Sequence, residues 1–352
     1  MGCGGSRPNI AAASKLEHIS KCALLTESAG WGLLDGGIIA ATALDARGSL
    51  KKKLEAAGER KFSDAEIETF KLVLCHYLGR ESSAMLLDLV YAQKARDCID
   101  NMDCCGMLVA YEAGSRKDGP PPLMPGWSAG RILREGGNGV KLLVYYNPEW
   151  DPEVKEATCA FVEQVGAECA GVGLPFFLEV LTLDEHSDGV EYARKKPLLV
   201  LAAVEEFSKP RYRVDVLKLE FPALAKYTKG LKWIKTPPHN GEYAYDTKEV
   251  AGYMKAMSDK ARVPFIFLSA GVDMPVFCEM LTLAGKSGCR YCGVLCGRAT
   301  WKGAVEVYAK EGEEALAKWV QTEGLENLKM LKTVLSNYAT PLRRKSPLYA
   351  YS

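Results

Sequence analysis

The stretches GVKLLVYY (139–146), FFLEVLT (176–182) and VDVLKLE (214–220) are apolar runs of strand length, and each carries an ionisable side chain in its interior. Near-continuous hydrophobic strands are typical of a parallel sheet that is covered on both faces. Period-2 alternation places Glu179 and Lys218 each on one face of its strand, together with apolar neighbours. These runs predict a buried parallel sheet with charges inside it.

Apolar runs of this kind occur eight times and alternate with helical patterns. They are 37–44, 84–87, 106–111, 140–146, 175–181, 214–219, 264–269 and 291–296. Three helix starts are marked by capping pairs, namely Ser63 with Glu66, Asp151 with Pro152, and Asp246 with Glu249. Eight strands close into a barrel whose interior their side chains just fill. The sequence therefore predicts an α/β fold, a single (β/α)8 TIM barrel, rather than an open sheet.

The chain as a whole has the composition of a soluble globular protein. Its 352 residues include 45 basic and 44 acidic ones, a formal charge of +1 that offers no surface for wrapping nucleic acid. No apolar run reaches the roughly 18 residues of a membrane span, and no secretory signal precedes the barrel. We expect a cytoplasmic protein with an N-terminal extension at 1–30, a (β/α)8 barrel at 31–340 and a tail at 341–352.

Cysteines and histidines do not form a metal-ligand pattern. Cys289, Cys292 and Cys296 make a C-x2-C-x3-C run, but no second pair or neighbouring histidine accompanies it. The four histidines are widely spaced, so a zinc mechanism is not expected. We expect buried free thiols in a reducing compartment, with no metal and no cofactor.

Active sites of barrels of this kind lie at the carboxyl ends of the strands. The polar residues that follow or occupy those ends are Asp45, Asp88, Lys141, Glu179, Lys218, Ser269, Gly297 and Arg298. A charge inside a strand is costly unless it is paired, so one interpretation is a structural Lys–Glu ion pair. However, two lysines against one glutamate leave a surplus positive charge, which favours an anionic substrate.

The same three charged residues meet the needs of amine catalysis. A lysine that attacks a carbonyl must first lose its proton, and a second cation together with desolvation promotes that loss. Glu179 could then shuttle protons during carbinolamine dehydration and carbon–carbon cleavage.

Three further segments are notable. The loops Ser269-Ala270-Gly271 and Gly297-Arg298-Ala299-Thr300 offer N–H groups, a hydroxyl and a guanidinium, which predicts a phosphate cradle. The segment 223–245 is too long for an ordinary connection, and it is either an active-site lid or a solvated surface loop.

The motifs LSAGV (268–272), GVLCGRATWKGAV (293–305) and LLDLVYAQKARD (86–97), with the three strand runs above, resemble the class I tagatose-bisphosphate aldolases. Sulfofructose-phosphate aldolases are near relatives of that family. The resemblance extends from about residue 38 to 319. It implies a metal-independent lyase with a Schiff-base lysine at Lys218 and a catalytic acid/base at Glu179.

The resemblance also implies the substrate contacts. These are Asp45, Lys141, Ser269 and Arg298, with Gly271, Gly297 and Arg47 as further residues for the phosphates. One departure is Ala46, where family members commonly have glutamine, while Arg47 remains. The exact ketose, and the choice between phosphate and sulfonate, therefore stay open.

The expected activity is cleavage of a ketose 1,6-bisphosphate, foremost tagatose 1,6-bisphosphate, to dihydroxyacetone phosphate and glyceraldehyde 3-phosphate. A sulfofructose-phosphate aldolase, or a transaldolase that uses the same lysine, is the alternative within enzymes. A membrane-tethered pseudoenzyme that only binds sugar phosphate is the alternative outside them, although Lys218, Glu179 and Lys141 argue against it. The sequence leaves open whether the chain forms a homo-oligomer.

The first residues match a lipidation pattern. Met1-Gly2-Cys3-Gly4-Gly5-Ser6 fits M-G-x-x-x-[ST], with Gly2 as the myristoylation site and Cys3 as a palmitoylation site. The alternative is a flexible tail with a chance match. Membrane contact is expected only if both residues are acylated, because one acyl chain gives marginal binding.

Overall fold

The computed structural model describes residues 37–102 and 104–342, and these form a closed barrel of eight parallel strands. The strands follow one another around the barrel in the order β1, β10, β9, β6, β5, β4, β3 and β2. Their bounds are β1 Ile39–Ala43, β2 Ala84–Leu87, β3 Gly106–Ala110, β4 Gly139–Tyr146, β5 Phe176–Thr182, β6 Val216–Leu219, β9 Phe265–Phe267 and β10 Gly293–Cys296. The predicted TIM barrel is confirmed, with most strands slightly shorter than the apolar runs.

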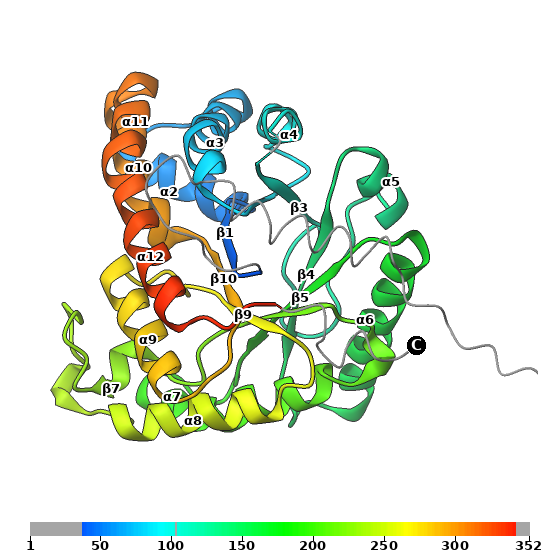
Figure 1. Cartoon of the computed structure of the whole chain (residues 1–352), viewed down its shortest axis with the longest axis vertical. Coiled ribbons are helices and arrows are strands. Elements are labelled where there is room, and N and C mark those ends of the chain that lie inside the picture. The colour runs from blue at the N-terminus through cyan, green and yellow to red at the C-terminus, as the bar shows by residue number, and fades with distance from the viewer. Residues whose placement is uncertain (1–36, 103, 343–352) are drawn as a thin grey trace, which may run out of the picture.

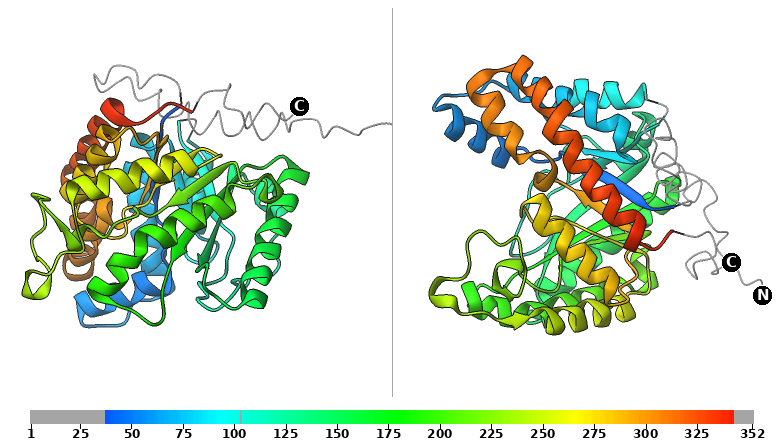
Figure 2. Two further views of the ribbon diagram at one scale, coloured as in Figure 1. Left: turned by 90° about the horizontal axis from the view of Figure 1, so that it is seen from below. Right: turned by 60° about the vertical axis from the view of Figure 1, so that its left-hand side comes forward.

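Helices surround the barrel, and in Figure 1 the labelled barrel strands lie in the middle of the molecule with helices on the outside. Their bounds are α2 Gly48–Gly58, α3 Asp64–Leu78, α4 Gln93–Asp100, α5 Ala129–Arg134, α6 Pro152–Val172, α7 Gly189–Phe207, α8 Thr247–Lys260, α9 Met274–Lys286, α10 Arg298–Glu311, α11 Glu313–Trp319 and α12 Leu325–Tyr338. Figure 2 shows α12 lying across the outside of the barrel, where it packs against α9. None of the described helices is long and apolar enough to cross a membrane.

The predicted helix starts are present. The Ser63 hydroxyl accepts a hydrogen bond from the Glu66 N–H, and the Glu66 carboxylate accepts one from the Ser63 N–H. Asp246 and Glu249 form the same reciprocal box at the start of α8. Each box satisfies N–H groups that the first helical turn leaves without partners, so these helices begin where the sequence predicts.

The long segment 223–245 is fastened to the outside of α9. It contains two short strands, β7 Thr228–Lys229 and β8 Tyr245–Asp246, that pair with each other. The N–H groups of Lys232 and Trp233 donate to the Glu279 carboxylate, at 3.0 and 3.3 Å. This segment contributes none of the ion-pair partners of the charged residues at the strand ends, as far as the described residues go.

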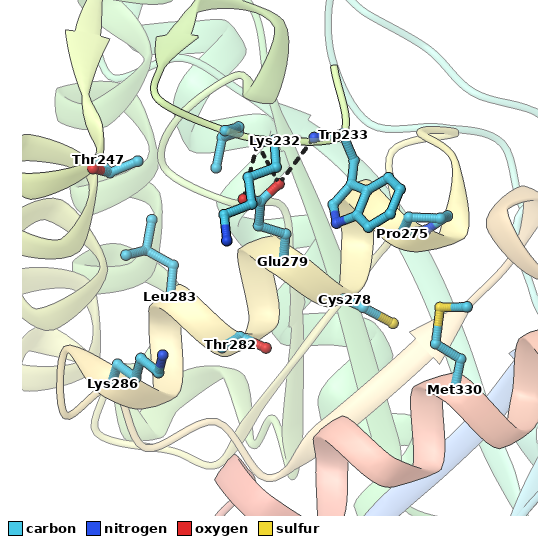
Figure 3. Close-up of a pocket in the computed structure, with 11 residues that line it drawn as sticks. Lys232, Trp233, Thr247, Pro275, Cys278, Glu279, Thr282, Leu283, Lys286 and Met330 are labelled. Atoms are coloured by element: carbon cyan, nitrogen blue, oxygen red, sulfur yellow. Dashed lines mark hydrogen bonds between the residues drawn. The ribbon is translucent and has the colours of Figure 1, made fainter. Parts of the chain in front are cut away.

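A cavity of about 500 Å³ lies between this segment and the helices beneath it. Figure 3 shows the Trp233 indole on one side of the cavity, Met330 from α12 on another, and Glu279 reaching up to the loop. The cavity is on the outer surface of the barrel, away from the buried charges described below.

The two ends of the described chain meet at the amino ends of the strands. The Leu342 N–H donates to the Gly37 carbonyl at 2.8 Å, two residues before β1 begins. The predicted extension at 1–30 lies outside the described residues, and so do the two acylation sites, Gly2 and Cys3, and most of the predicted tail at 341–352.

Candidate active site

A buried ammonium group with three carboxylates lies at the carboxyl ends of the strands. The Lys141 Nζ lies 2.9 Å from Asp45 Oδ2, 2.6 Å from Glu112 Oε1 and 2.8 Å from Glu179 Oε2. Only 2% of the Lys141 side chain is exposed. Strands far apart in the sequence therefore bring four charged groups into direct contact.

Lys218 joins this network through Glu179. Glu179 on β5 is in register with Lys218 on β6, and the Lys218 Nζ lies 2.8 Å from Glu179 Oε2. The Lys218 side chain is 4% exposed. One carboxylate oxygen thus accepts from both lysines, as the predicted grouping of Lys141, Glu179 and Lys218 requires.

Glu112 is a site residue that the sequence analysis did not include. It follows β3 by two residues, and its Oε2 accepts a hydrogen bond from the Leu143 N–H at 3.1 Å. Its signal was available, because it is the first charged residue after the apolar run 106–111. The rule that found Asp45 after the first strand would have found Glu112 as well.

The charge count corrects one step of the sequence analysis. Two ammonium groups face three carboxylates, Asp45, Glu112 and Glu179, so the cluster carries a surplus negative charge when all are ionised. The prediction of a surplus positive charge at the lysines was wrong. An anionic substrate must be neutralised by cations outside this cluster.

The environments of the three carboxylates separate their pKa values. Burial opposes ionisation of Asp45, but the charges of Lys141 and Lys218 hold its pKa well below the usual value. Burial likewise opposes ionisation of Glu179, and the same two lysines lower its pKa. Burial raises the pKa of Glu112, although the charge of Lys141 works against this rise.

Lys141 remains an ammonium ion in this setting. Burial disfavours its charge, but Asp45, Glu112 and Glu179 together raise the pKa of Lys141 well above its usual value. Its protons are therefore shared among three acceptors, and it is not a neutral nucleophile.

Arg47 is held beside this cluster. One guanidinium nitrogen donates to the Glu112 carbonyl at 2.8 Å, and another lies 3.3 Å from the sulfur of Met124. Ala46, which precedes it, is partly buried against the core. The Arg47 guanidinium is therefore held by a carbonyl and a sulfur atom, and no described carboxylate pairs with it.

The predicted phosphate cradle lies at the ends of β9 and β10. Ala270 and Gly271 both have positive φ, 49° and 76°, a conformation that turns successive N–H groups toward one side. A Cβ on Gly271 would lie 2.7 Å from the Arg298 guanidinium carbon, so the guanidinium rests against this glycine. Arg298 is exposed, begins α10, and has no side-chain partner among the described residues.

The hydroxyl groups near the cradle are only partly available. Thr300 is fully buried and its hydroxyl donates to the Cys296 sulfur at 3.2 Å. Burial raises the pKa of Cys296 to about 11, while hydrogen bonds with Thr300 and Ser269 oppose the rise. Thr300 therefore faces the core, which leaves the main chain around Gly271 and Gly297 and the Arg298 side chain for the predicted cradle.

Asp88 is separate from the cluster. Its carboxylate pairs with the fully buried Lys71 of α3, and the Lys71 ammonium also donates to the Leu44 carbonyl at 2.9 Å. The second oxygen of Asp88 accepts from the Val90 and Tyr91 N–H groups. This second ion pair links the end of β1 to the turn after β2. The linked residue at the end of β1 is Leu44, which immediately precedes Asp45.

No group of three histidine, cysteine or carboxylate side chains within residues 37–102 and 104–342 is arranged to hold a metal ion. Cys289 and Cys292 are buried, and burial raises the pKa of each to about 12.

Comparison with known proteins identifies relatives of this chain. The model of the DeoC/LacD family of aldolases matches residues 39–303. A tagatose 1,6-diphosphate aldolase of Listeria monocytogenes is 43% identical over 317 residues, which is 87% of this chain and 90% of that protein. One from Streptococcus pneumoniae is 38% identical and covers 88% of this chain and 95% of its own length.

A solved structure with the same fold is fructose-bisphosphate aldolase from Plasmodium falciparum. Its TM-score is 0.65, and the match covers 95% of this chain and 96% of that one. At 13% sequence identity, this likeness concerns the barrel fold alone.

Proposed function

Because the chain belongs to the DeoC/LacD aldolase family and is thus a carbon–carbon lyase, we propose that it cleaves tagatose 1,6-bisphosphate through a Schiff base on Lys218. The observation that carries this proposal is the buried contact of 2.8 Å between the Lys218 Nζ and Glu179 Oε2. It places a carboxylate proton acceptor against an amine in a dry part of the barrel. Schiff-base chemistry requires this pairing.

The first half of the reaction forms the imine. The Lys218 ammonium gives a proton to Glu179, and the neutral amine attacks the C2 carbonyl of the open-chain ketose. Glu179 then returns a proton to the carbinolamine hydroxyl, which leaves as water. Lys141 remains charged, and its ammonium stabilises negative charge that develops on the substrate oxygens.

The second half breaks the bond between C3 and C4. Glu179 takes the proton of the C4 hydroxyl, and the electrons of the C3–C4 bond move to the iminium and form an enamine. Glyceraldehyde 3-phosphate leaves at this point. Protonation of the enamine at C3 and hydrolysis of the imine then release dihydroxyacetone phosphate and free Lys218.

The two phosphates need cations beyond the carboxylate-rich cluster. Arg298, with the N–H groups around Gly271 and Gly297, is suited to one phosphate because its guanidinium has no protein partner in the described chain. Arg47, which donates to the Glu112 carbonyl beside the cluster, is suited to the other. Asp45 and Ser269 are proposed to contact the sugar.

Borohydride trapping tests the assignment. Tagatose 1,6-bisphosphate with borohydride should add a covalent mass to the protein, and peptide mass spectrometry should locate it on Lys218. Activity should survive a chelator. A label on another lysine, or complete loss of activity with chelator, would contradict the proposal.

Ala46 is the reason to test several ketose substrates in the trapping experiment. Family members commonly carry an amide at this position, and its absence removes a hydrogen-bonding group beside the substrate. The panel therefore includes fructose 1,6-bisphosphate, a sulfofructose phosphate and a transaldolase donor. If the sulfosugar is trapped faster than both bisphosphates, the alternative of a sulfofructose-phosphate aldolase replaces the leading one.

We also propose a cytoplasmic location, with attachment to membranes through Gly2 and Cys3 when both are acylated. The support for attachment is the M-G-x-x-x-[ST] pattern at residues 1–6.

A further inference from the structure

We propose that Glu112 is the terminal proton acceptor of a relay that starts at Lys218 and passes through Glu179 and Lys141. This inference rests on the proposed Schiff-base function. Glu112 does not touch the reacting atoms. It acts through Lys141, and it is therefore a positioning residue rather than a catalytic residue.

The relay is a continuous chain of short contacts. Lys218 Nζ lies 2.8 Å from Glu179 Oε2, the same oxygen lies 2.8 Å from Lys141 Nζ, and Lys141 Nζ lies 2.6 Å from Glu112 Oε1. All four side chains are buried, so bulk water does not compete along this path. Each step is within the distance at which a proton moves along a hydrogen bond.

The proton balance of the relay is simple. Lys218 gives one proton to Glu179, and Lys141 gives one of its own protons to Glu112 as it takes the proton from Glu179. Lys218 becomes the neutral amine and Glu112 becomes a carboxylic acid. Glu179 and Lys141 end in the states in which they began, and the same path returns the proton when the reaction needs it.

The directions of the carboxylate pKa values favour Glu112 as the end point. Asp45 and Glu179 have lowered pKa values, so neither is a stable resting place for a proton. The pKa of Glu112 is raised by burial. Lys141 keeps its charge and serves only as the conduit.

The groups that face Glu112 are consistent with this role. Lys141 stabilises its charged form, the Asp45 charge disfavours that form, and Glu179 is linked to it through Lys141. The Arg47 guanidinium contacts its carbonyl rather than its carboxylate. The Leu143 N–H donates to Oε2, which leaves Oε1, the oxygen on Lys141, to receive the proton.

The relay leaves the total charge of the site unchanged. With all five groups charged the cluster has one negative charge too many, and a proton transferred within it leaves the total unchanged. A nucleophile can therefore be generated without exchange of a proton with solvent while a dianionic phosphate is bound nearby.

The sign of the pH dependence follows from the acceptor. Glu112 accepts a proton only as a carboxylate, so wild-type imine formation should decline as the pH falls through the raised pKa of Glu112. Glu112→Gln removes the acceptor at every pH. Its rate should be about 10²-fold below wild type near neutral pH. The deficit should shrink as the pH rises, because hydroxide can then remove the proton from Lys218.

The experiment is rapid-quench borohydride trapping from pH 5 to 10 with wild type, Glu112→Gln and the control Glu168→Gln. Glu168 accepts from the Ala129 N–H and from the hydroxyl of Tyr111, the residue before Glu112, and Glu168 itself lies outside the cluster. The control should follow the wild-type profile. A deficit in Glu112→Gln that is constant across the pH range would show that Glu112 only holds Lys141 in place, and would overturn the relay.

Infrared difference spectroscopy provides a second readout that does not depend on the fold of one variant. The carbonyl band of a new carboxylic acid should rise before the imine in wild type and fall as the imine forms, because the returned proton leaves with the water. It should be absent in Glu112→Gln and altered in Glu112→Asp, which keeps an acceptor. Wild type that traps substrate on Lys218 without an acid band refutes the relay alone, whereas wild type that traps nothing refutes the proposed function.

Discussion

Gly271→Ala tests whether Arg298 and the cradle bind phosphate, and its effect on phosphate affinity can be distinguished from its effect on stability. An added Cβ would lie 2.7 Å from the Arg298 guanidinium carbon and 2.8 Å from one of its nitrogens. The guanidinium is the far end of a flexible side chain, so it moves rather than the main chain. Because Arg298 is then displaced from the cradle, phosphate binding should weaken.

The magnitude can be worked from the contact. A charge-assisted hydrogen bond contributes about 1.5 to 3 kcal/mol, so losing it weakens binding about 10- to 150-fold. Alanine at the φ of 76° also costs about 1 to 2 kcal/mol of stability. Calorimetric titration with dihydroxyacetone phosphate measures the first effect, and urea unfolding measures the second.

A matched glycine provides the control. Gly288 has a φ of 80°, but its added Cβ would approach nothing closer than 3.6 Å, on the Lys255 side chain. Gly288→Ala should lose similar stability and keep the wild-type phosphate affinity. In an Arg298→Ala background, Gly271→Ala should weaken binding little further, because both act through the same guanidinium. Equal affinities for the two glycine variants would refute the reasoning.

Four other substitutions have defined outcomes. Glu179→Gln should lower turnover about 10²- to 10⁴-fold with the fold intact, measured by steady-state kinetics and circular dichroism; near-normal turnover would return Glu179 to a structural role. Lys71→Met leaves the buried Asp88 carboxylate without its partner and should lower the free energy of unfolding by about 3 to 5 kcal/mol, measured by urea titration; an unchanged unfolding midpoint would contradict the ion pair. Gly2→Ala should release the protein from membranes of its host, while Cys3→Ser should leave weak attachment; a fully soluble wild type with an unmodified N-terminus would refute acylation.

The fold could be predicted because its signals are local. Strand-length apolar runs and capping pairs such as Ser63 with Glu66 depend on neighbours within a few residues, and the barrel places them as expected. The pairing of Glu179 with Lys218 followed from two adjacent strands with period-2 alternation. Strand bounds were predicted less closely: β6 and β10 begin two residues after the apolar runs 214–219 and 291–296, because a strand is defined by its backbone pairing and not by hydrophobicity alone.

The composition of the charge cluster could not be predicted in full. Asp45 and Lys141 are 96 residues apart in the sequence, and their contact depends on how the barrel closes. Glu112 carried a signal that was overlooked, and its omission produced the wrong sign for the surplus charge. The role of Asp88 could not be read from its position at a strand end, because its partner Lys71 comes from the middle of a helix.

The hydrogen bond between Leu342 and Gly37 has a practical consequence for immobilisation. Both residues lie at the amino ends of the strands, and the charge cluster lies at the carboxyl ends, about 15 Å away for strands of five residues. A bead, an electrode or a fusion partner joined near either residue would therefore sit on the face opposite the mouth of the barrel. Substrate could reach the mouth from solution, so the chain can be arrayed on a surface through either of these points without blocking access to Lys218.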